Sequence, residues 1–413
     1  MRTWMIIAIF TTHAALGQVP VNNNWWSAAN VGGAVSASAG INVTSSKFTN
    51  QFARGLLLSE HLDNGSKKSQ YGNLNAQGLN RVGMDYEVSL AGSHRIGQSP
   101  HQVVWKVSDA AHLDAAVDRD LYGLAFYGNQ RYAGDTISIG GSEAFGMRYQ
   151  KIGLGWNYII SEHTRTHVML NYVNGEQLVE VQFERARLYT SNLGDTLDVD
   201  VLGTYRQSDS GQVGFASPNG AGLSIDLGFV TTFQAKSSEW VFQAAVYDLG
   251  MVQWGGRTIE VSADTIVNWT GVALPDLEGV DSEFTTQLED SVNHLVDGVS
   301  KNQTHNTWLA GTAAISLMQS KSKGIEFGGG AAVRWQANYA PFSYLVGGYQ
   351  FSQAIGASMQ VGYGGYGTIQ AGINFDARFE HFLVELQLAN LEAWAVPSRF
   401  GGASGRLNLQ YVF

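Results

Sequence analysis

The feature that most constrains the fold is an alternation of apolar and polar residues, which recurs along the chain in runs of about ten residues. The run that ends the sequence places Leu407, Leu409, Tyr411 and Phe413 at alternate positions, with polar residues such as Arg406 between them. Because successive side chains of a β-strand point to opposite faces, this run predicts a strand with one apolar and one polar face.

The same pattern recurs at intervals over most of the sequence, in residues 81–90, 151–158, 223–229, 327–336, 355–363 and 369–376. Most of these runs are longer than the ~5–6 residues of a typical soluble strand and approach the length that a tilted strand needs to cross a membrane. Aromatic residues lie near their ends, as in the interfacial girdles of membrane barrels. The polar faces carry Gly, Ser, Asn and Gln with few charges, whereas a soluble exterior would carry more Lys and Glu.

These runs predict an all-β fold, a single transmembrane antiparallel β-barrel of about 14 strands with short helices in its loops. The membrane that accepts such barrels is the outer membrane of a Gram-negative cell. Residues 179–189, 198–206 and 258–267 also alternate, and they are open to interpretation as extensions of hairpins beyond the membrane.

Composition supports a barrel and excludes several classes of function. Charged residues make up only 15% of the chain, yet the mean hydropathy is −0.09, as expected when an apolar exterior and a polar interior offset each other. The net charge of −10 argues against nucleic acid as a partner. Cysteine is absent, which excludes disulfides and thiolate metal sites.

The first residues are typical of a secretory signal peptide, predicted over residues 1–17, with Arg2 followed by the apolar run 4–10 and the small residues 15–17. The barrel is then expected to span residues 18–413. Residues 18–30 form a poor strand, and two interpretations stay open: a plug inside the barrel, or a lead-in to the first strand.

Three segments interrupt the strand pattern. Residues 272–306 are predicted to be a long loop with an amphipathic helix, since Phe284, Leu288, Val292 and Leu295 recur at helical spacing. This helix could cover the barrel mouth, enter the interior or bind a partner, or simply pack as a loop. Residues 108–121 are a second helix candidate, and residues 56–75 are expected to be a polar loop.

The sequence predicts no catalytic, cofactor-binding or metal-binding residues, because it lacks the G-x-S-x-G and H-E-x-x-H patterns. The protein is therefore not expected to be an enzyme. The charged residues on the predicted inner faces are the candidate functional groups. They could pair with one another and rigidify the interior, or they could line a conduit or ligand site. The candidates facing the lumen are Arg81, Asp85, Glu87, Arg334, Glu385 and Arg406, and Glu180 and Glu184 share this pattern.

Several stretches resemble an uncharacterised Bacteroidota outer-membrane barrel family that is related to FadL-like fatty-acid transporters and PorV-like barrels. These stretches are residues 145–158, 224–229, 240–254, 327–336 and 406–413. The resemblance implies a single FadL-like barrel. FadL-type proteins carry an N-terminal hatch with an Asn-Pro-Ala motif, whereas this chain has residues 27–30 as Ser-Ala-Ala-Asn, so the resemblance does not extend to the hatch.

Two functions follow as hypotheses. The first is a passive channel for small hydrophobic molecules. The second is a structural or type IX secretion-associated barrel that acts through other envelope proteins. In either case outer-membrane lipid and the barrel-assembly machinery are expected partners. The apolar face Leu407, Leu409, Tyr411 and Phe413 resembles the C-terminal signal that this machinery recognises.

Overall fold

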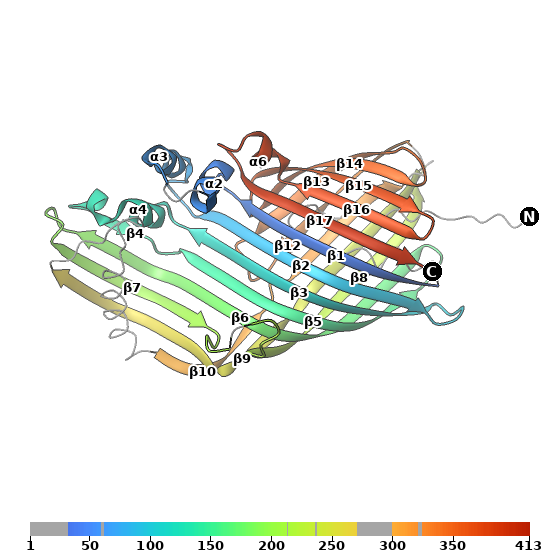
Figure 1. Ribbon diagram of the computed structural model, residues 1–413, viewed down its shortest axis with the longest axis horizontal. Coiled ribbons are helices and arrows are strands. Elements are labelled where there is room, and N and C mark those ends of the chain that lie inside the picture. Colours follow the sequence, from blue (N-terminus) through green and yellow to red (C-terminus); the bar gives the residue numbers. More distant parts are fainter. Residues whose placement is uncertain (1–31, 59–61, 213, 236–237, 271–299, 321–323) are drawn as a thin grey trace, which may run out of the picture.

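A computed structural model describes residues 32–58, 62–212, 214–235, 238–270, 300–320 and 324–413 (Figure 1). The strands in chain order are β1 (Gly33–Ser45), β2 (Asn80–Arg95), β3 (His101–Val117), β4 (Thr136–Ser138), β5 (Glu143–Ile159), β6 (Thr164–Thr190), β7 (Thr196–Gln207), β8 (Gly220–Ala235), β9 (Ser238–Thr270), β10 (Ser300–Trp308), β11 (Thr312–Ser320), β12 (Gly324–Arg334), β13 (Ala340–Gln350), β14 (Ile355–Gly365), β15 (Ile369–Phe379), β16 (Phe382–Ala389) and β17 (Gly401–Val412). The helices are α2 (Asn50–Leu58), α3 (Asn64–Asn73), α4 (Arg119–Tyr127), the 3-10 turn η2 (Asn129–Tyr132) and α6 (Leu391–Ala395).

Fourteen of these strands form one closed antiparallel barrel, as the sequence predicts. The order around the ring is β1, β2, β3, β5, β6, β8, β9, β11, β12, β13, β14, β15, β16 and β17. The first and last strands close the ring, with Ala34 opposite Val412 and Ser45 opposite Gly401. Closure leaves the ring without the unpaired edges that an open sheet exposes.

Two strands continue far beyond the ring and carry an extension on one side of the barrel (Figure 1). The first half of β6 pairs with β8, and its second half pairs with β7. In the same way, β9 pairs first with β8 and later with β7 and β10. Residues 179–189, 198–206 and 258–267 lie in this extension, beyond the closed ring.

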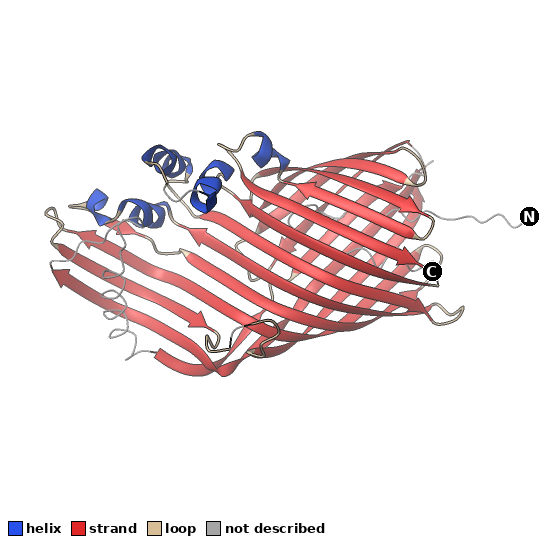
Figure 2. Ribbon diagram, in the orientation of Figure 1, coloured by secondary structure: helices blue, strands red, loops and turns tan. Residues whose placement is uncertain are grey.

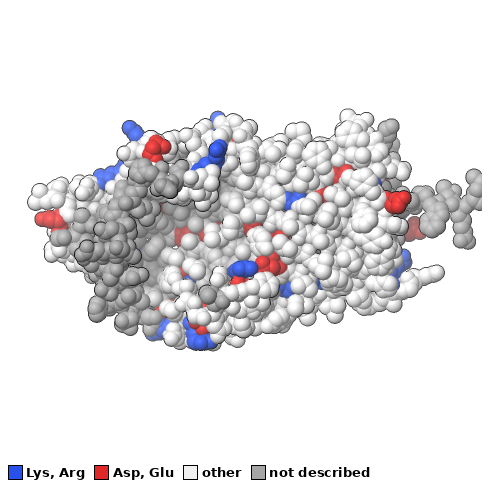
Figure 3. All heavy atoms as spheres, in the orientation of Figure 1, with Lys and Arg blue, Asp and Glu red and all other residues white. Residues whose placement is uncertain are grey.

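The alternation of the sequence becomes an inner and an outer face. Leu345 and Leu154 are 73% and 66% exposed on the outer face, while Asn408, Gln360 and Ser108 are buried inside. Charged side chains are sparse over the strand wall and more frequent near the helices (Figure 3). The barrel thus has an apolar outer face around a polar interior.

The two ends of the barrel differ. Short turns such as 160–163 and 351–354 lie at the end near the C-terminus, whereas α2, α3, α4 and α6 lie at the opposite end (Figure 2). The helices α2, α3 and α4 pack against one another through the rings of Phe52, Tyr71, Tyr122 and Phe126. Within the described part of the chain, no helix has the length and apolar character required to span a membrane.

The expected helix over residues 108–121 is wrong for most of its length, because residues 108–117 belong to β3. Ser108, His112 and Asp114 alternate with outward residues and are buried among polar partners inside the barrel, so tertiary contacts override the helical propensity of the intervening alanines. A helix begins only at α4, where the side chain of Asp118 accepts a hydrogen bond from the N–H of Asp120.

Two other expectations change. The polar loop expected at residues 56–75 contains the end of α2 and all of α3. Residues 300–306, expected in the long loop, form part of β10. The predicted signal peptide, the segment 18–30 and the amphipathic helix within 272–299 lie outside the described residues.

Candidate functional site in the barrel interior

An ion pair joins opposite walls of the barrel. Nη1 of Arg334 lies 2.7 Å from Oδ2 of Asp85, and Nη2 lies 2.9 Å from Oδ1, a bidentate arrangement. Nη2 also donates to the carbonyl of Ala310 at 3.3 Å. Arg334 ends β12 and Asp85 lies in β2, and these strands are seven positions apart in either direction around the ring. The pair therefore joins strands on opposite sides of the ring.

A histidine extends this contact along the wall. Nδ1 of His112 lies 2.8 Å from Oδ1 of Asp85, and Nε2 lies 2.9 Å from Oδ2 of Asp114. The hydroxyl of Tyr366, from the opposite wall, is 3.3 Å from the same Nε2. Asn338, in the turn after β12, donates from Nδ2 to Asp114 at 2.7 Å. Both nitrogens of the imidazole thus face carboxylates, and the turn after β12 is fixed to β3.

A second level of charges lies one step along the strands. Nζ of Lys106 is 3.1 Å from both carboxylate oxygens of Glu87, and Arg406 approaches Glu87 at 3.7 Å. Nearby, Nζ of Lys151 is 2.5 Å from Oδ1 of Asp248. These residues come from β2, β3, β17, β5 and β9, so the second level connects strands around much of the ring.

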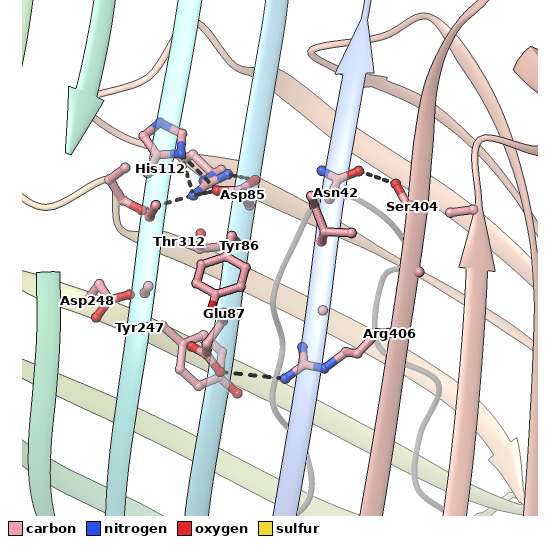
Figure 4. A pocket seen from close by; sticks show the side chains of 18 of the residues that line it. Asn42, Asp85, Tyr86, Glu87, His112, Tyr247, Asp248, Thr312, Ser404 and Arg406 are labelled. Atoms are coloured by element: carbon pink, nitrogen blue, oxygen red, sulfur yellow. Dashed lines mark hydrogen bonds and ion pairs between the residues drawn. The ribbon is translucent and has the colours of Figure 1, made fainter. Parts of the chain in front are cut away.

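A cavity lies between the two levels of charge (Figure 4). It holds about 80 Å³ of space for the centres of water-sized molecules, within about 810 Å³ of space not filled by protein atoms that includes open solvent. Its charged wall is formed by Asp85, Glu87, Asp248, Arg334 and Arg406. The remaining wall is largely apolar and aromatic, formed by Ala110, Tyr149, Tyr247, Ala310 and Ala389 among others.

The buried pairs have a physical consequence for the interior. Removing two charges from water costs several kcal/mol per ion, and only close, hydrogen-bonded geometry offsets that cost. The Arg334–Asp85 contact provides this geometry, and the Arg334 and Asp85 side chains are only 3% and 13% exposed. The network therefore holds opposite walls at a fixed separation.

The residues predicted to face the lumen lie at different places. Asp85, Glu87, Arg334 and Arg406 meet in the network described above. Glu385 is buried elsewhere in the interior, where Asn408 donates to its carboxylate at 3.0 Å. Two other candidates lie away from the network: Arg81 is half-buried near the beginning of β2, and Glu180 lies in the extension.

Several members of the network, Asp114 among them, were not among the candidates. Lys106 and Lys151 occupy inward positions of alternating runs, so the period-two pattern alone could have found them. His112 lies in the segment expected to be helical. Asp248 has a φ of +56° beside a register shift between β8 and β9, and such a bulge alters the alternation that would have identified it.

A separate charged cluster lies in the extension. Arg206 donates to Glu260 at 2.6 Å and to Glu180 at 3.1 Å, and His305 lies 3.7 Å from Glu180. The hydrogen bond from Arg206 lowers the pKa of Glu260. Burial and the neighbouring Arg206 lower the pKa of His305 despite the two carboxylates. Within the described ranges, no group of three or more His, Asp or Glu residues is arranged to hold a metal ion.

The closed 14-strand ring defines the class of this protein as a β-barrel with a polar, charge-bridged interior. By its sequence the chain belongs to DUF5723, a family of unknown function whose profile matches residues 19–385. No curated protein matches the sequence.

Solved structures with similarity to the chain are also barrels. They include the P. putida toluene transporter TodX, with 6% identity and a TM-score of 0.42 over 92% of this chain and 90% of that one. The translocator domain of the autotransporter NalP from Neisseria meningitidis has 8% identity and a TM-score of 0.35 over 93% and 89%. The CymD monoaromatic hydrocarbon channel has 10% identity and a TM-score of 0.32 over 93% and 89%. Values this low support no inference about activity.

Proposed function

We propose that this protein is an outer-membrane β-barrel that acts as a passive channel for small hydrophobic molecules. The observation that carries the proposal is the interior cavity, whose wall combines Ala110, Tyr149 and Tyr247 with a few charged groups. Mostly apolar walls with a few placed polar groups are typical of small-molecule sites. The apolar outer face of the strands suits contact with lipid.

The charged network sets a condition on transport. Because Arg334 and Asp85 line the cavity and join opposite walls, a molecule that leaves the cavity between them must separate the pair. The channel proposal therefore requires the pair to separate, or the molecule to leave by another route along the wall.

The same pair favours a second candidate function, a non-transporting barrel that acts through envelope proteins, as PorV-like barrels do. A permanently bridged interior would suit a structural role, since the pair fixes the shape of the wall. Uptake measurements separate the two functions.

The experiment uses purified protein in liposomes that contain an internal acceptor for a hydrophobic dye. For a channel we expect uptake above protein-free liposomes. Ala110→Phe should reduce uptake, because the added ring enters the cavity. Ala357→Phe is the matched control, since it adds the same ring on the outer face of β14, outside the cavity.

The outcomes distinguish the functions. Uptake that is lost in Ala110→Phe and retained in Ala357→Phe supports the channel. A wild-type rate equal to that of protein-free liposomes contradicts it and favours the structural role. If uptake is found only in Arg334→Ala, the bridge closes the barrel in the native state.

A further inference from the structure

The apolar outer face ends along a defined line on one side of the barrel. Polar side chains occupy most of one registered row of outward positions, which is interrupted by Ala221 on β8, and apolar side chains fill the next row toward the short-turn end. The polar row contains Asp109, Gln150, Asn174 and Gln253 on β3, β5, β6 and β9. The apolar row contains Val107, Ile152, Tyr172, Leu223 and Met251. We call the apolar outer face of the strands the apolar belt. This line is the edge of the belt that faces away from the short-turn end.

A loop leaves the wall at this line. β7 ends at Gln207 and β8 begins at Gly220, and both pair with β6, so the chain between them is an excursion from the sheet. Its base is closed by hydrogen bonds from the N–H of Ser208 to Leu178 at 3.0 Å and from the N–H of Asn219 to Gly175 at 3.1 Å. We name residues 208–212 and 214–219 the Phe215 loop. It lies in front of the strand wall in Figure 2.

A buried carboxylate fixes the Phe215 loop to the outer wall. Glu176, whose side chain is 1% exposed, accepts a hydrogen bond from the N–H of Ala216 at 3.0 Å. The same carboxylate accepts from Gln150 at 2.6 Å and pairs with Arg148 at 3.2 Å. Arg148 also pairs with Asp109 at 3.2 Å. These contacts lie on the outward face of β3, β5 and β6, so the loop covers the polar row from outside.

The tip of this fixed loop presents an aromatic side chain. Phe215 is 73% exposed and precedes Ala216, the residue that Glu176 holds. A large apolar side chain held at the edge of an apolar belt extends that belt, and aromatic residues are favoured at the boundary between hydrocarbon and headgroups.

We propose that the Phe215 loop is a lipid anchor, and that Phe215 inserts among the lipids around the barrel at the level of the headgroups. Continuity with the apolar belt identifies lipid as the occupant, because the residues that follow Phe215 contact Glu176 and Asn174, which border the row of Tyr172 and Ile152. The inference rests on the proposed membrane location of the barrel. It assigns the loop a lipid contact that fixes the height of the barrel in the membrane.

The test uses the absence of native cysteine, which makes any introduced cysteine unique. Phe215→Cys, Leu154→Cys and Leu193→Cys are each labelled with a polarity-sensitive fluorophore and reconstituted in phosphatidylcholine vesicles. Parallel vesicles carry lipids with a nitroxide quencher on the headgroup or deep in the acyl chain. Leu154 is 66% exposed within the belt, and Leu193 is 88% exposed at the turn between β6 and β7, far along the extension.

We expect the label at position 154 to be quenched by the deep nitroxide, the label at 215 by the headgroup nitroxide, and the label at 193 by neither. If the label at 215 behaves like that at 193 while 154 is quenched, the anchor is overturned and the membrane barrel stands. If the label at 154 is not quenched, the membrane location itself is overturned.

A second variant tests whether Glu176 positions the anchor. Phe215→Cys is combined with Glu176→Gln, which replaces the carboxylate that Ala216 and Arg148 share. We expect headgroup quenching of the label at 215 to fall. Quenching of the label at 154 in a Leu154→Cys, Glu176→Gln protein should stay unchanged. Unchanged quenching at 215 would show that Glu176 does not hold the loop at the lipid surface.

Discussion

At the scale of single residues, the bidentate contact of Arg334 with Asp85 determines the shape of the interior. It forms between strands that face each other across the ring, so its geometry depends on the whole barrel being closed. His112 shares the Asp85 carboxylate and connects it to Asp114. Loss of Arg334 would leave the buried Asp85 carboxylate with His112 as its remaining charged partner.

Removal of the guanidinium should therefore be strongly destabilising. We expect Arg334→Ala to lower the free energy of unfolding by about 3–5 kcal/mol, because it leaves Asp85 without its main cation. Arg257→Ala is the matched control. Arg257 is 70% exposed and pairs with Asp209, so its loss should cost about 0–1 kcal/mol. Urea unfolding in vesicles measures both, and similar losses would contradict this account.

A close approach inside the barrel allows a second residue-scale prediction. A Cβ on Gly83 would lie 2.2 Å from the ring of Tyr366, so Gly83→Ala should displace the ring and destabilise the barrel by about 1–3 kcal/mol. A Cβ on Gly347 would meet no atom within 4 Å, which makes Gly347→Ala the control. Equal unfolding midpoints for the two variants would show that the ring of Tyr366 moves aside without a loss of stability.

At the scale of elements, period-two alternation was sufficient to predict a strand wherever one face is apolar and the other polar, as in β14 and β17. It failed in β3, where Ala110, Ala111, Ala115 and Ala116 resemble a helix and only the partners across the barrel make His112 and Asp114 inward residues. Local propensity cannot show such partners, because they come from strands more than 200 residues away.

The extension gives an element-scale prediction about pH. Folding lowers the pKa of His305 below its ordinary value of 6.5, so the unfolded segment binds a proton more readily than the folded one. Stability is therefore lost as pH falls below 6.5, and Glu260, whose pKa is also lowered, adds to the loss in more acidic solution. We expect limited proteolysis of β7 and β10 to be faster at about pH 5 than at about pH 7.

The control for this prediction removes the titrating imidazole. His305→Asn should reduce the difference in proteolysis between the two pH values, while cleavage within the closed ring should change little in either protein. An identical pH dependence in the variant would assign the effect to other groups.

At the scale of the whole molecule, the sequence predicted the barrel and its strand number because closure needs only repeated alternation. It could not predict which inward charges meet. Asp85 and Arg334 are separated by 249 positions in the chain, and their contact depends on the order of strands around the ring. The Phe215 loop was missed for a similar reason, since its attachment depends on the bulged Glu176 and not on a recurring pattern.

Phe413 extends the pairing that closes the ring, which gives the final prediction. The N–H of Phe413 donates to the carbonyl of Gly33 and the N–H of Gly33 donates to the carbonyl of Phe413, both at 3.0 Å, so this pair adds two bonds to the β1–β17 register. Deletion of Phe413 removes both bonds and the apolar terminal side chain that we expect the assembly machinery to recognise. We expect its level in the outer-membrane fraction to fall more than its synthesis or export.

The matched control is Phe382→Ala, which removes a ring from the neighbouring strand that lies 5.0 Å from Tyr411 but leaves the terminal residue in place. Immunoblots of outer-membrane and periplasmic fractions compare the two variants. If the signal lies in the terminal residue, the Phe413 deletion accumulates in the periplasm and Phe382→Ala reaches the membrane. A normal membrane level of the deletion variant would mean that β1 and β17 close the ring without Phe413, through the register from Ala34–Val412 to Ser45–Gly401 alone.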